Sequence, residues 1–74
     1  MKPTLGRIVH YVLNNGEHRA AIVVNYFGGD RANLTVMLDQ MNDTGANNGT
    51  LAVGSAKQDE DDKAPGTWHW PERE

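Results

Sequence analysis

The strongest constraint on the fold is a pair of apolar runs on either side of a turn. The segments "GRIVHYVL" and "EHRAAIVVNYF" are rich in β-branched and aromatic residues, which favour strands. Asn14-Asn15-Gly16 separates them and is typical of a tight hairpin turn, because Asn and Gly accept the positive φ angles that such turns need. The sequence therefore predicts two paired antiparallel strands, at about residues 6–13 and 18–27.

Three further strands are predicted downstream. In "ANLTVMLD" at 32–39, apolar residues alternate with mostly polar ones, which indicates a strand with one buried face. "LAVGSAKQ" at 51–58 is a weaker strand, in which Gly54 marks a bulge or a close approach. "TWHW" is typical of a short final strand, and the polar segments at 40–50 and 59–66 are predicted loops.

Five short strands joined by turn signals predict an all-β fold. The expected architecture is a small five-stranded antiparallel barrel of the SH3-like type. The alternative is a meandering sheet that a partner chain completes. Residues 1–74 are expected to form a single small β domain, with 1–5 and 71–74 as terminal segments.

Small size and surface pattern both favour a homo-oligomer. A chain of 74 residues has a marginal core, and without cysteine it has neither disulfides nor a thiolate zinc site to reinforce it. The first two predicted strands are also apolar on both faces, whereas a half-solvated sheet should alternate. Burial against another subunit explains this pattern, and strong curvature of the barrel is the alternative.

Charge limits the classes of partner. The net charge is −3, which argues against binding to long nucleic acids. The acidity is concentrated in the "DEDDK" run at 59–63 and in the Glu-rich end, so a small anionic ligand held by one or two arginines remains compatible. The absence of cysteine, of a signal peptide and of an apolar span predicts a cytoplasmic protein with no membrane partner.

The tryptophans of "TWHW" are candidates for ligand binding. On a strand, Trp68 and Trp70 project to one face and His69 to the other. They either fill the core, with the indole N–H bonded to a carbonyl oxygen, or form a surface on which a planar ligand such as a nucleobase stacks.

Three arginines are candidates for binding phosphate. Arg19 and Arg31 lie near predicted strand ends, where small barrels meet their ligands, and Arg7 opens the first strand. A guanidinium group beside an aromatic ring suits a phosphate that bears a base. The alternative is that these residues are ordinary surface charges, or that they pair with Asp30 and Glu17.

No metal, cofactor or catalytic group is predicted. His10, His18 and His69 are not spaced two residues apart, and no nearby carboxylate completes a recognised metal-binding pattern. "DQMNDTGANNG" departs from a calcium loop, and the "DEDD" run is typical of a solvated loop. Without cysteine or a serine in an elbow motif, a non-enzymatic role is expected.

The segments "MKPTLGRIVHYVL", "NLTVMLD" and "TWHWPE" resemble a family of small, uncharacterised phage and prophage proteins. These proteins begin with a Lys-Pro-Thr-x-Gly-Arg segment and close on Thr-Trp-His-Trp-Pro. The resemblance covers both ends and the middle strand and departs in the loops at 40–50 and 55–66. It implies a phage protein that acts against host defence, similar in role to the anti-CBASS sponge proteins that sequester cyclic nucleotide signals.

The predicted function is tight binding of a cyclic di- or oligonucleotide in a pocket shared between subunits, without turnover. The expected ligand-binding residues are Trp68, Trp70 and Tyr11 for base stacking, Arg7, Arg19 and Arg31 for phosphates, and Asn33 and His69 for base edges. An acidic module that inhibits a host protein, or mimics nucleic acid through residues 59–62, is the alternative. A structural role in the virion is a third hypothesis.

Overall fold

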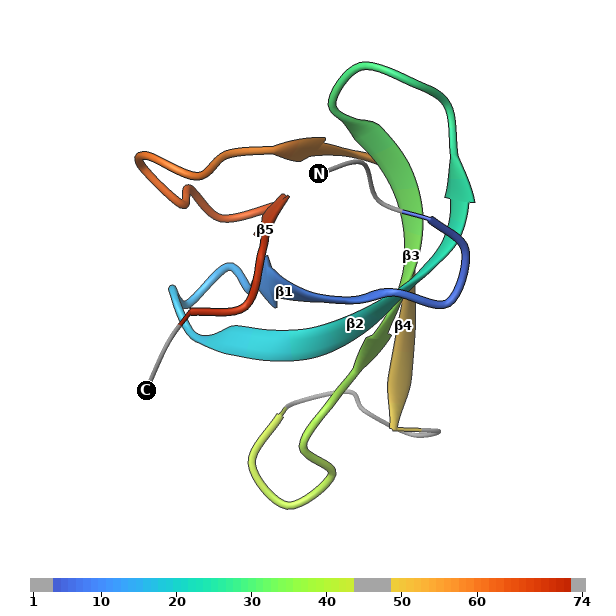
Figure 1. The fold of residues 1–74 in the computed structure, drawn as a ribbon. Coiled ribbons are helices and arrows are strands. Elements are labelled where there is room, and N and C mark those ends of the chain that lie inside the picture. The colour runs from blue at the N-terminus through green and yellow to red at the C-terminus, as the bar shows by residue number, and fades with distance from the viewer. Residues whose placement is uncertain (1–3, 44–48, 73–74) are drawn as a thin grey trace.

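The computed structural model describes residues 4–43 and 49–72. Parts of the predicted loop at 40–50 and of the predicted terminal segments at 1–5 and 71–74 therefore lie outside the described residues. The described chain contains five strands (Figure 1): β1 (Ile8–Val12), β2 (His18–Tyr26), β3 (Arg31–Met37), β4 (Thr50–Gln58) and β5 (Thr67–His69).

The strands close into a barrel in the order β1-β2-β3-β4-β5. Neighbours from β1 to β4 pair antiparallel, and β5 runs antiparallel to β1, beside which it lies in Figure 1. This confirms the predicted five-stranded all-β barrel. One pair differs from the expectation: β4 and β5 are parallel, with Lys57 opposite Thr67 and Gln58 opposite Trp68, and residues 59–66 connect them.

The β1–β2 hairpin closes through a three-residue loop. The Leu13 amide donates to the Glu17 carbonyl (2.8 Å), and the Gly16 amide donates back to the Leu13 carbonyl (2.9 Å). Of the three loop residues, Gly16 alone has a positive φ, of 87°. The turn was therefore placed correctly, but Asn14 and Asn15 do not need the left-handed conformation that the sequence suggested for asparagine there.

The core is small and centred on one tryptophan. The side chain of Trp68 is fully buried, together with valines and a leucine from β1, β2 and β3. Three of its neighbours in the core are alanines, Ala21, Ala32 and Ala56, whose small side chains leave room for the indole ring. The indole N–H donates to the Ala56 carbonyl (3.1 Å) and the Asp30 carbonyl (3.2 Å), so the buried polar atom is satisfied.

The outer face of the β1–β2 hairpin remains partly apolar. Ile8 is 48% exposed and Val24 is 49% exposed, whereas Val9 and Val23 on the inner face are buried. The barrel core thus accounts for the apolar residues on the inner face of the hairpin, and the apolar residues on its outer face stay half exposed. The predicted homo-oligomer stays a prediction. Within the described residues, no helix is long and apolar enough to span a membrane.

Candidate metal centre

Three histidines from three neighbouring strands meet on the outside of the barrel. His10 lies in β1 directly opposite His69 of β5. His18 opens β2 and pairs with Val12, two residues along β1 from His10. Because side chains alternate along a strand, positions 10 and 12 point to the same face, and the three imidazole rings share one patch.

Glu72 joins these rings from the segment that follows β5. Its Oε1 atom lies 2.8 Å from His69 Nε2, 2.9 Å from His18 Nδ1 and 3.1 Å from His10 Nδ1. Hydrogen bonds from His69, His10 and His18 lower the pKa of Glu72 to about 2. The carboxylate is therefore anionic at neutral pH. We call these four residues the His/Glu cluster.

The His/Glu cluster is buried at one side and open at the other. The side chain of His69 is fully buried, while those of His10 and His18 are 23% and 30% exposed and that of Glu72 is 38% exposed. The His18 and His69 rings are nearest, with centroids 4.7 Å apart. Solvent thus reaches the cluster from the side of Glu72, His10 and His18.

The hydrogen-bond inventory of the His/Glu cluster leaves one atom without a partner. His69 Nδ1 is buried and, among the described residues, has no hydrogen-bond partner. In the tautomer that donates from Nε2 to Glu72, Nδ1 carries only a lone pair. If Nε2 ligates a metal, the proton moves to Nδ1, where the missing acceptor lowers the metal affinity relative to a site with a complete second shell.

The donor atoms fit a transition-metal site. One nitrogen from each histidine and one Glu72 oxygen all lie within 4.8 Å of one another. In a tetrahedral zinc site with bonds of about 2.0–2.1 Å, ligand atoms are about 3.3 Å apart, so even the largest separation of 4.8 Å contracts by only about 1.5 Å. Rotation of the partly exposed side chains of His10, His18 and Glu72 can supply that movement.

Sequence reasoning missed this cluster because it tested spacing along the chain. His10 and Glu72 are 62 positions apart, and no local motif connects them. The prediction that no metal pattern exists is therefore corrected: strand register brings the three histidines together, and Glu72 supplies the nearby carboxylate. The spacing of His69 and Glu72, three residues apart, and the hairpin register were the available signals.

The tryptophan pair is mainly structural. Trp68 is fully buried, so the prediction that it stacks on a ligand is corrected: its ring has no accessible face. Trp70 is half-buried and packs edge-on against Trp68, with ring centroids 5.6 Å apart. The Arg7 guanidinium lies over the Trp70 ring, 5.6 Å from its centroid. Tyr11 is partly buried and packs against the core.

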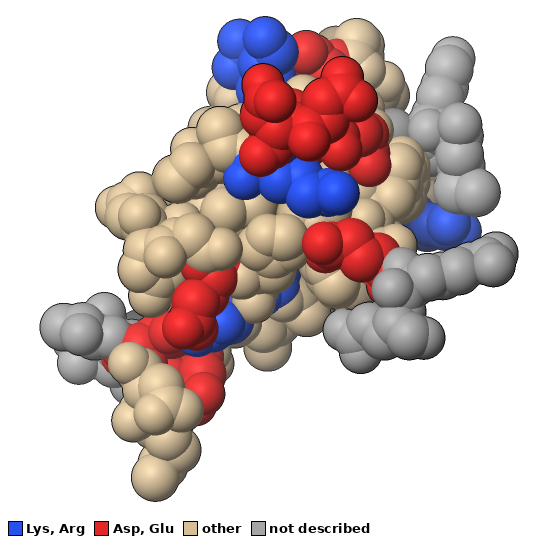
Figure 2. Space-filling view, turned by 90° about the vertical axis from the view of Figure 1, so that its left-hand side faces the viewer, with Lys and Arg blue, Asp and Glu red and all other residues tan. Residues whose placement is uncertain are grey.

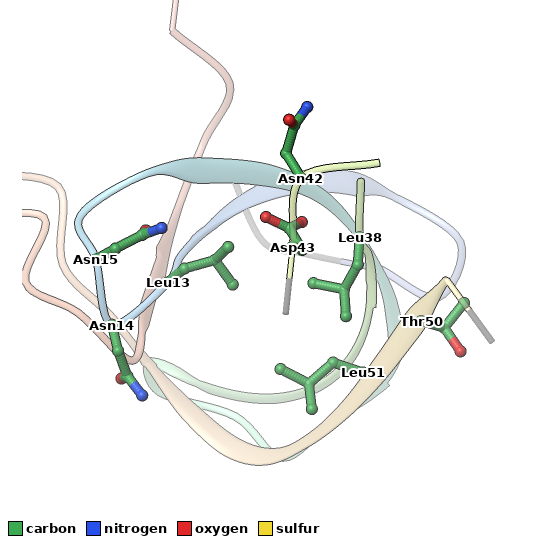
Figure 3. A pocket seen from close by; sticks show the side chains of 8 residues that line it. All are labelled: Leu13, Asn14, Asn15, Leu38, Asn42, Asp43, Thr50 and Leu51. Atoms are coloured by element: carbon green, nitrogen blue, oxygen red, sulfur yellow. The ribbon is translucent and has the colours of Figure 1, made fainter. Parts of the chain in front are cut away.

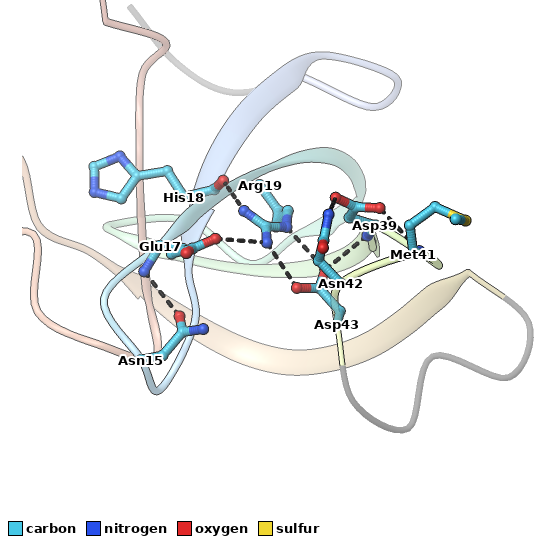
Figure 4. Close-up of polar contacts among 8 residues, drawn as sticks. All are labelled: Asn15, Glu17, His18, Arg19, Asp39, Met41, Asn42 and Asp43. Carbon is cyan, nitrogen blue, oxygen red and sulfur yellow. Dashed lines mark hydrogen bonds and ion pairs between the residues drawn. The ribbon is translucent and has the colours of Figure 1, made fainter.

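Arg19 is held in an ion-pair network on the inner side of the β2 start (Figure 4). It donates to both Asp43 oxygens (2.8 and 2.6 Å), to Glu17 (2.8 Å) and to the carbonyl of His18 (2.9 Å). These hydrogen bonds raise the pKa of Arg19 and lower that of Asp43. The His18 ring points away from this network in Figure 4.

Arg31 and Asn33 also make local contacts. Arg31 donates to the Ser55 carbonyl (3.1 Å) and lies 3.8 Å from Asp30. The Asn33 side-chain oxygen accepts from the Ser55 amide (2.7 Å). The pairings of Arg31 with Asp30 and of Arg19 with Glu17, which were the alternative prediction for these arginines, are thus present. The predicted ligand-binding residues do not form one site: Arg7, Tyr11, Trp68 and Trp70 lie in one neighbourhood, and Arg31 and Asn33 meet at Ser55 in another.

In the acidic loop at 59–62, the side chain of Asp59 stabilises the loop's own backbone. Asp59 accepts from the amides of Asp62 (3.0 Å) and Ala64 (3.3 Å), and these bonds lower its pKa. In Figure 2, basic side chains adjoin the upper group of acidic ones on two sides. The face shown therefore carries mixed charge, without the uniform negative charge that a nucleic-acid mimic needs.

A cavity of about 400 Å³ lies at the end of the barrel near the β1–β2 turn (Figure 3). Leu13, Leu38 and Leu51 point into it from three different segments, and Asn14, Asn15 and Asn42 lie at its rim. None of the predicted ligand-binding residues lines it.

Comparisons with protein-family models, with curated proteins and with solved structures give no match.

Proposed function

We propose that the protein binds a divalent transition-metal ion, with Zn²⁺ as the best fit, through the His/Glu cluster. The observation that carries this proposal is the convergence of three imidazole nitrogens on one carboxylate oxygen, each within 3.1 Å. Three neutral imidazoles and one carboxylate form a donor set typical of zinc and other borderline metals.

The donor types favour zinc over the alkaline-earth metals. Ca²⁺ and Mg²⁺ prefer sites built of oxygen ligands, whereas the His/Glu cluster offers three nitrogens and one oxygen. Thiolate-preferring ions find no thiolate ligand, because the chain lacks cysteine. Cu²⁺ and Ni²⁺ share the preference for imidazole and compete with zinc for this site.

Metal binding also supplies the reinforcement that a core of this size lacks. The ion would join β1, β2, β5 and the segment after β5. A ligand that binds only the folded chain stabilises it by about 2.7 kcal/mol when its free concentration is about 100 times Kd. A metal at the junction of three strands therefore raises the unfolding temperature, and the stabilisation grows with the logarithm of the free zinc concentration once that concentration exceeds Kd.

The test is equilibrium dialysis of chelator-treated protein against Zn²⁺. We expect one ion per chain. His10→Gln or His18→Gln removes a direct ligand and is expected to weaken binding by at least about 10–100-fold, which is the loss typical of changing an outer-shell partner. Both residues are partly exposed, so the variants should fold, which circular dichroism checks. Asp61→Asn, in an exposed loop, is the control and should bind as the unmodified protein does.

Absence of zinc uptake by the folded, chelator-treated protein contradicts the proposal. Equal affinity in the histidine variants and in Asp61→Asn contradicts it as well, because uptake would then come from another place.

Capture of a cyclic nucleotide stays a prediction, with a smaller residue set than the sequence suggested. The proposed nucleotide site no longer includes Trp68, because its ring is buried. It no longer includes Arg19, because the guanidinium group donates to Asp43 and Glu17. The phage origin, the cytoplasmic location and the alternative of a host-protein partner likewise remain predictions.

A further inference from the structure

The four members of the His/Glu cluster differ in how firmly the fold holds them. His10, His18 and His69 belong to paired strands of the closed barrel. Glu72 lies beyond β5 and has the most exposed side chain of the four, at 38%. The three histidines are therefore the fixed part of the site, and the Glu72 carboxylate is the part whose movement costs the least free energy.

Glu72 also holds its place through one atom. All three contacts to the histidines use Oε1, so this single oxygen atom is the point at which the carboxylate is held in the His/Glu cluster. A carboxylate that binds through one oxygen, from an exposed position, is open to competition by another anion. Rotation about the Glu72 side chain removes it from the histidines without disturbing a strand pair.

Charge makes an anion the natural replacement. Three neutral imidazoles leave the full positive charge of a divalent ion uncompensated, and Glu72 neutralises part of it. When Glu72 swings away, water or an external anion takes the free position, as in catalytic zinc sites that have three protein ligands and one exchangeable position. The approach is from solvent, since His10 and His18 are themselves partly exposed.

We propose that the metal held by His10, His18 and His69 binds a small oxyanion in exchange for Glu72. This inference rests on the proposed metal site and deepens it by naming the class of ligand. The same chemistry suits a phosphate, a carboxylate or a hydroxamate. The sequence predicts an anionic ligand, and this exchange binds one without using Trp68, which is buried, or Arg19, which is paired with Asp43.

The experiment uses the 74-residue chain loaded with Co²⁺, whose visible absorption reports the number and type of its ligands. Acetohydroxamic acid is the probe, which loses its proton and binds a metal as the hydroxamate anion. The metal content after gel filtration shows that the probe has not removed the ion. We expect the cobalt spectrum to change with a saturable dependence on acetohydroxamate. In Glu72→Gln the apparent affinity for the probe should rise by about tenfold, because the competing carboxylate is lost; outer-shell changes around a metal have effects of about 10–100-fold.

Asp61→Asn is the matched control, because it removes one negative charge from an exposed loop outside the His/Glu cluster. It should bind the probe as the unmodified protein does. A cobalt spectrum that does not respond to the probe, with the metal still bound, overturns the exchange but not the metal site. Equal probe affinity in Glu72→Gln and Asp61→Asn also overturns it. Failure of the chain to take up Co²⁺ or Zn²⁺ overturns the metal site itself and the exchange with it.

Discussion

At the scale of single residues, Asp43 does more than neutralise Arg19. One of its oxygens accepts the Asp39 amide (2.6 Å) in addition to Arg19 Nε (2.8 Å). The side chains of Asp43 and Arg19 are only 7% and 16% exposed. Loss of the charge at position 43 therefore leaves a guanidinium group poorly solvated and weakens the turn at 39–43 at the same time.

The pH dependence of stability identifies this contribution. Hydrogen bonds from Arg19 and from the Asp39 amide lower the folded-state pKa of Asp43. Its stabilising effect is therefore fully present above the unfolded-state pKa of about 3.9, and it is lost as the pH falls through the folded value. We expect Asp43→Asn to unfold at a lower temperature than the unmodified protein at pH 7, and the difference to shrink below about pH 4.

Thermal unfolding followed by circular dichroism at several pH values measures this difference. Asp61→Asn, which makes the same change of charge in an exposed loop, should follow the unmodified protein throughout. A difference between Asp43→Asn and the unmodified protein that stays constant down to about pH 2 contradicts the assignment, because a titrating carboxylate cannot produce it.

At the scale of elements, a bulge in β4 sets the direction of the strand's last residues. Gly54 and Ser55 lie opposite the single residue Asn33, since Ala32 pairs with Ala56 but Leu34 pairs with Val53. Ser55 has a positive φ of 50°, which is uncommon for a residue other than glycine. The bulge turns Ala56 into the core, and the Asn33 side chain supports it by accepting the Ser55 amide.

Removal of this acceptor should destabilise the barrel by about 1 kcal/mol, the net value of a typical hydrogen bond. For a domain of this size, that corresponds to a fall of about 4–8 °C in Tm. We expect this fall for Asn33→Ala. Asn33→Asp keeps an oxygen at the same position and should stay within a few degrees of the unmodified protein. Equal Tm values for the two variants would show that the bulge does not depend on this bond.

The hairpin and β3 were predictable because their signals are local. The apolar alternation and the turn at 14–16 fix the pairing of Val12 with His18, which places His18 diagonally across from His10. That much of the His/Glu cluster follows from sequence. The position of β5 does not, because a strand of three residues carries little pattern and pairs with β1 only after the chain has crossed the barrel.

The same limit explains the errors about individual side chains. Strand alternation predicts which residues share a face, but it does not tell which face of a short strand is covered. Trp68 and His69 lie on opposite sides of β5, and both are fully buried: one by the core, the other by His10, His18 and Glu72. A rule that assigns one face to the core and the other to solvent cannot produce that result.

At the scale of the whole molecule, the outer face of the hairpin bears on the predicted homo-oligomer. Ile8 and Val24 are each about half exposed on neighbouring strands. Native mass spectrometry should detect more than one chain per particle. The double variant Ile8→Ser/Val24→Ser should shift the mass to a single chain, because it removes apolar area from the proposed contact.

Met41→Ser is the control, since Met41 is 89% exposed in the loop after β3 and is not part of the apolar face of Ile8 and Val24, so the mass should stay unchanged. A single-chain mass for the unmodified protein contradicts the prediction. The barrel would then be stable as a monomer, and the apolar outer face of β1–β2 would be solvated.

The pairing of β5 with β1 has a consequence for the order of events in folding. β1 can pair with β5 only after nearly the whole chain has been synthesised. Pairing Tyr11 with Trp68 closes the longest loop of any strand pair in the barrel and therefore carries the largest entropic cost. A chain arrested before that step holds His10 and His18 but lacks the other two groups. Metal occupancy would therefore distinguish a finished barrel from every earlier intermediate.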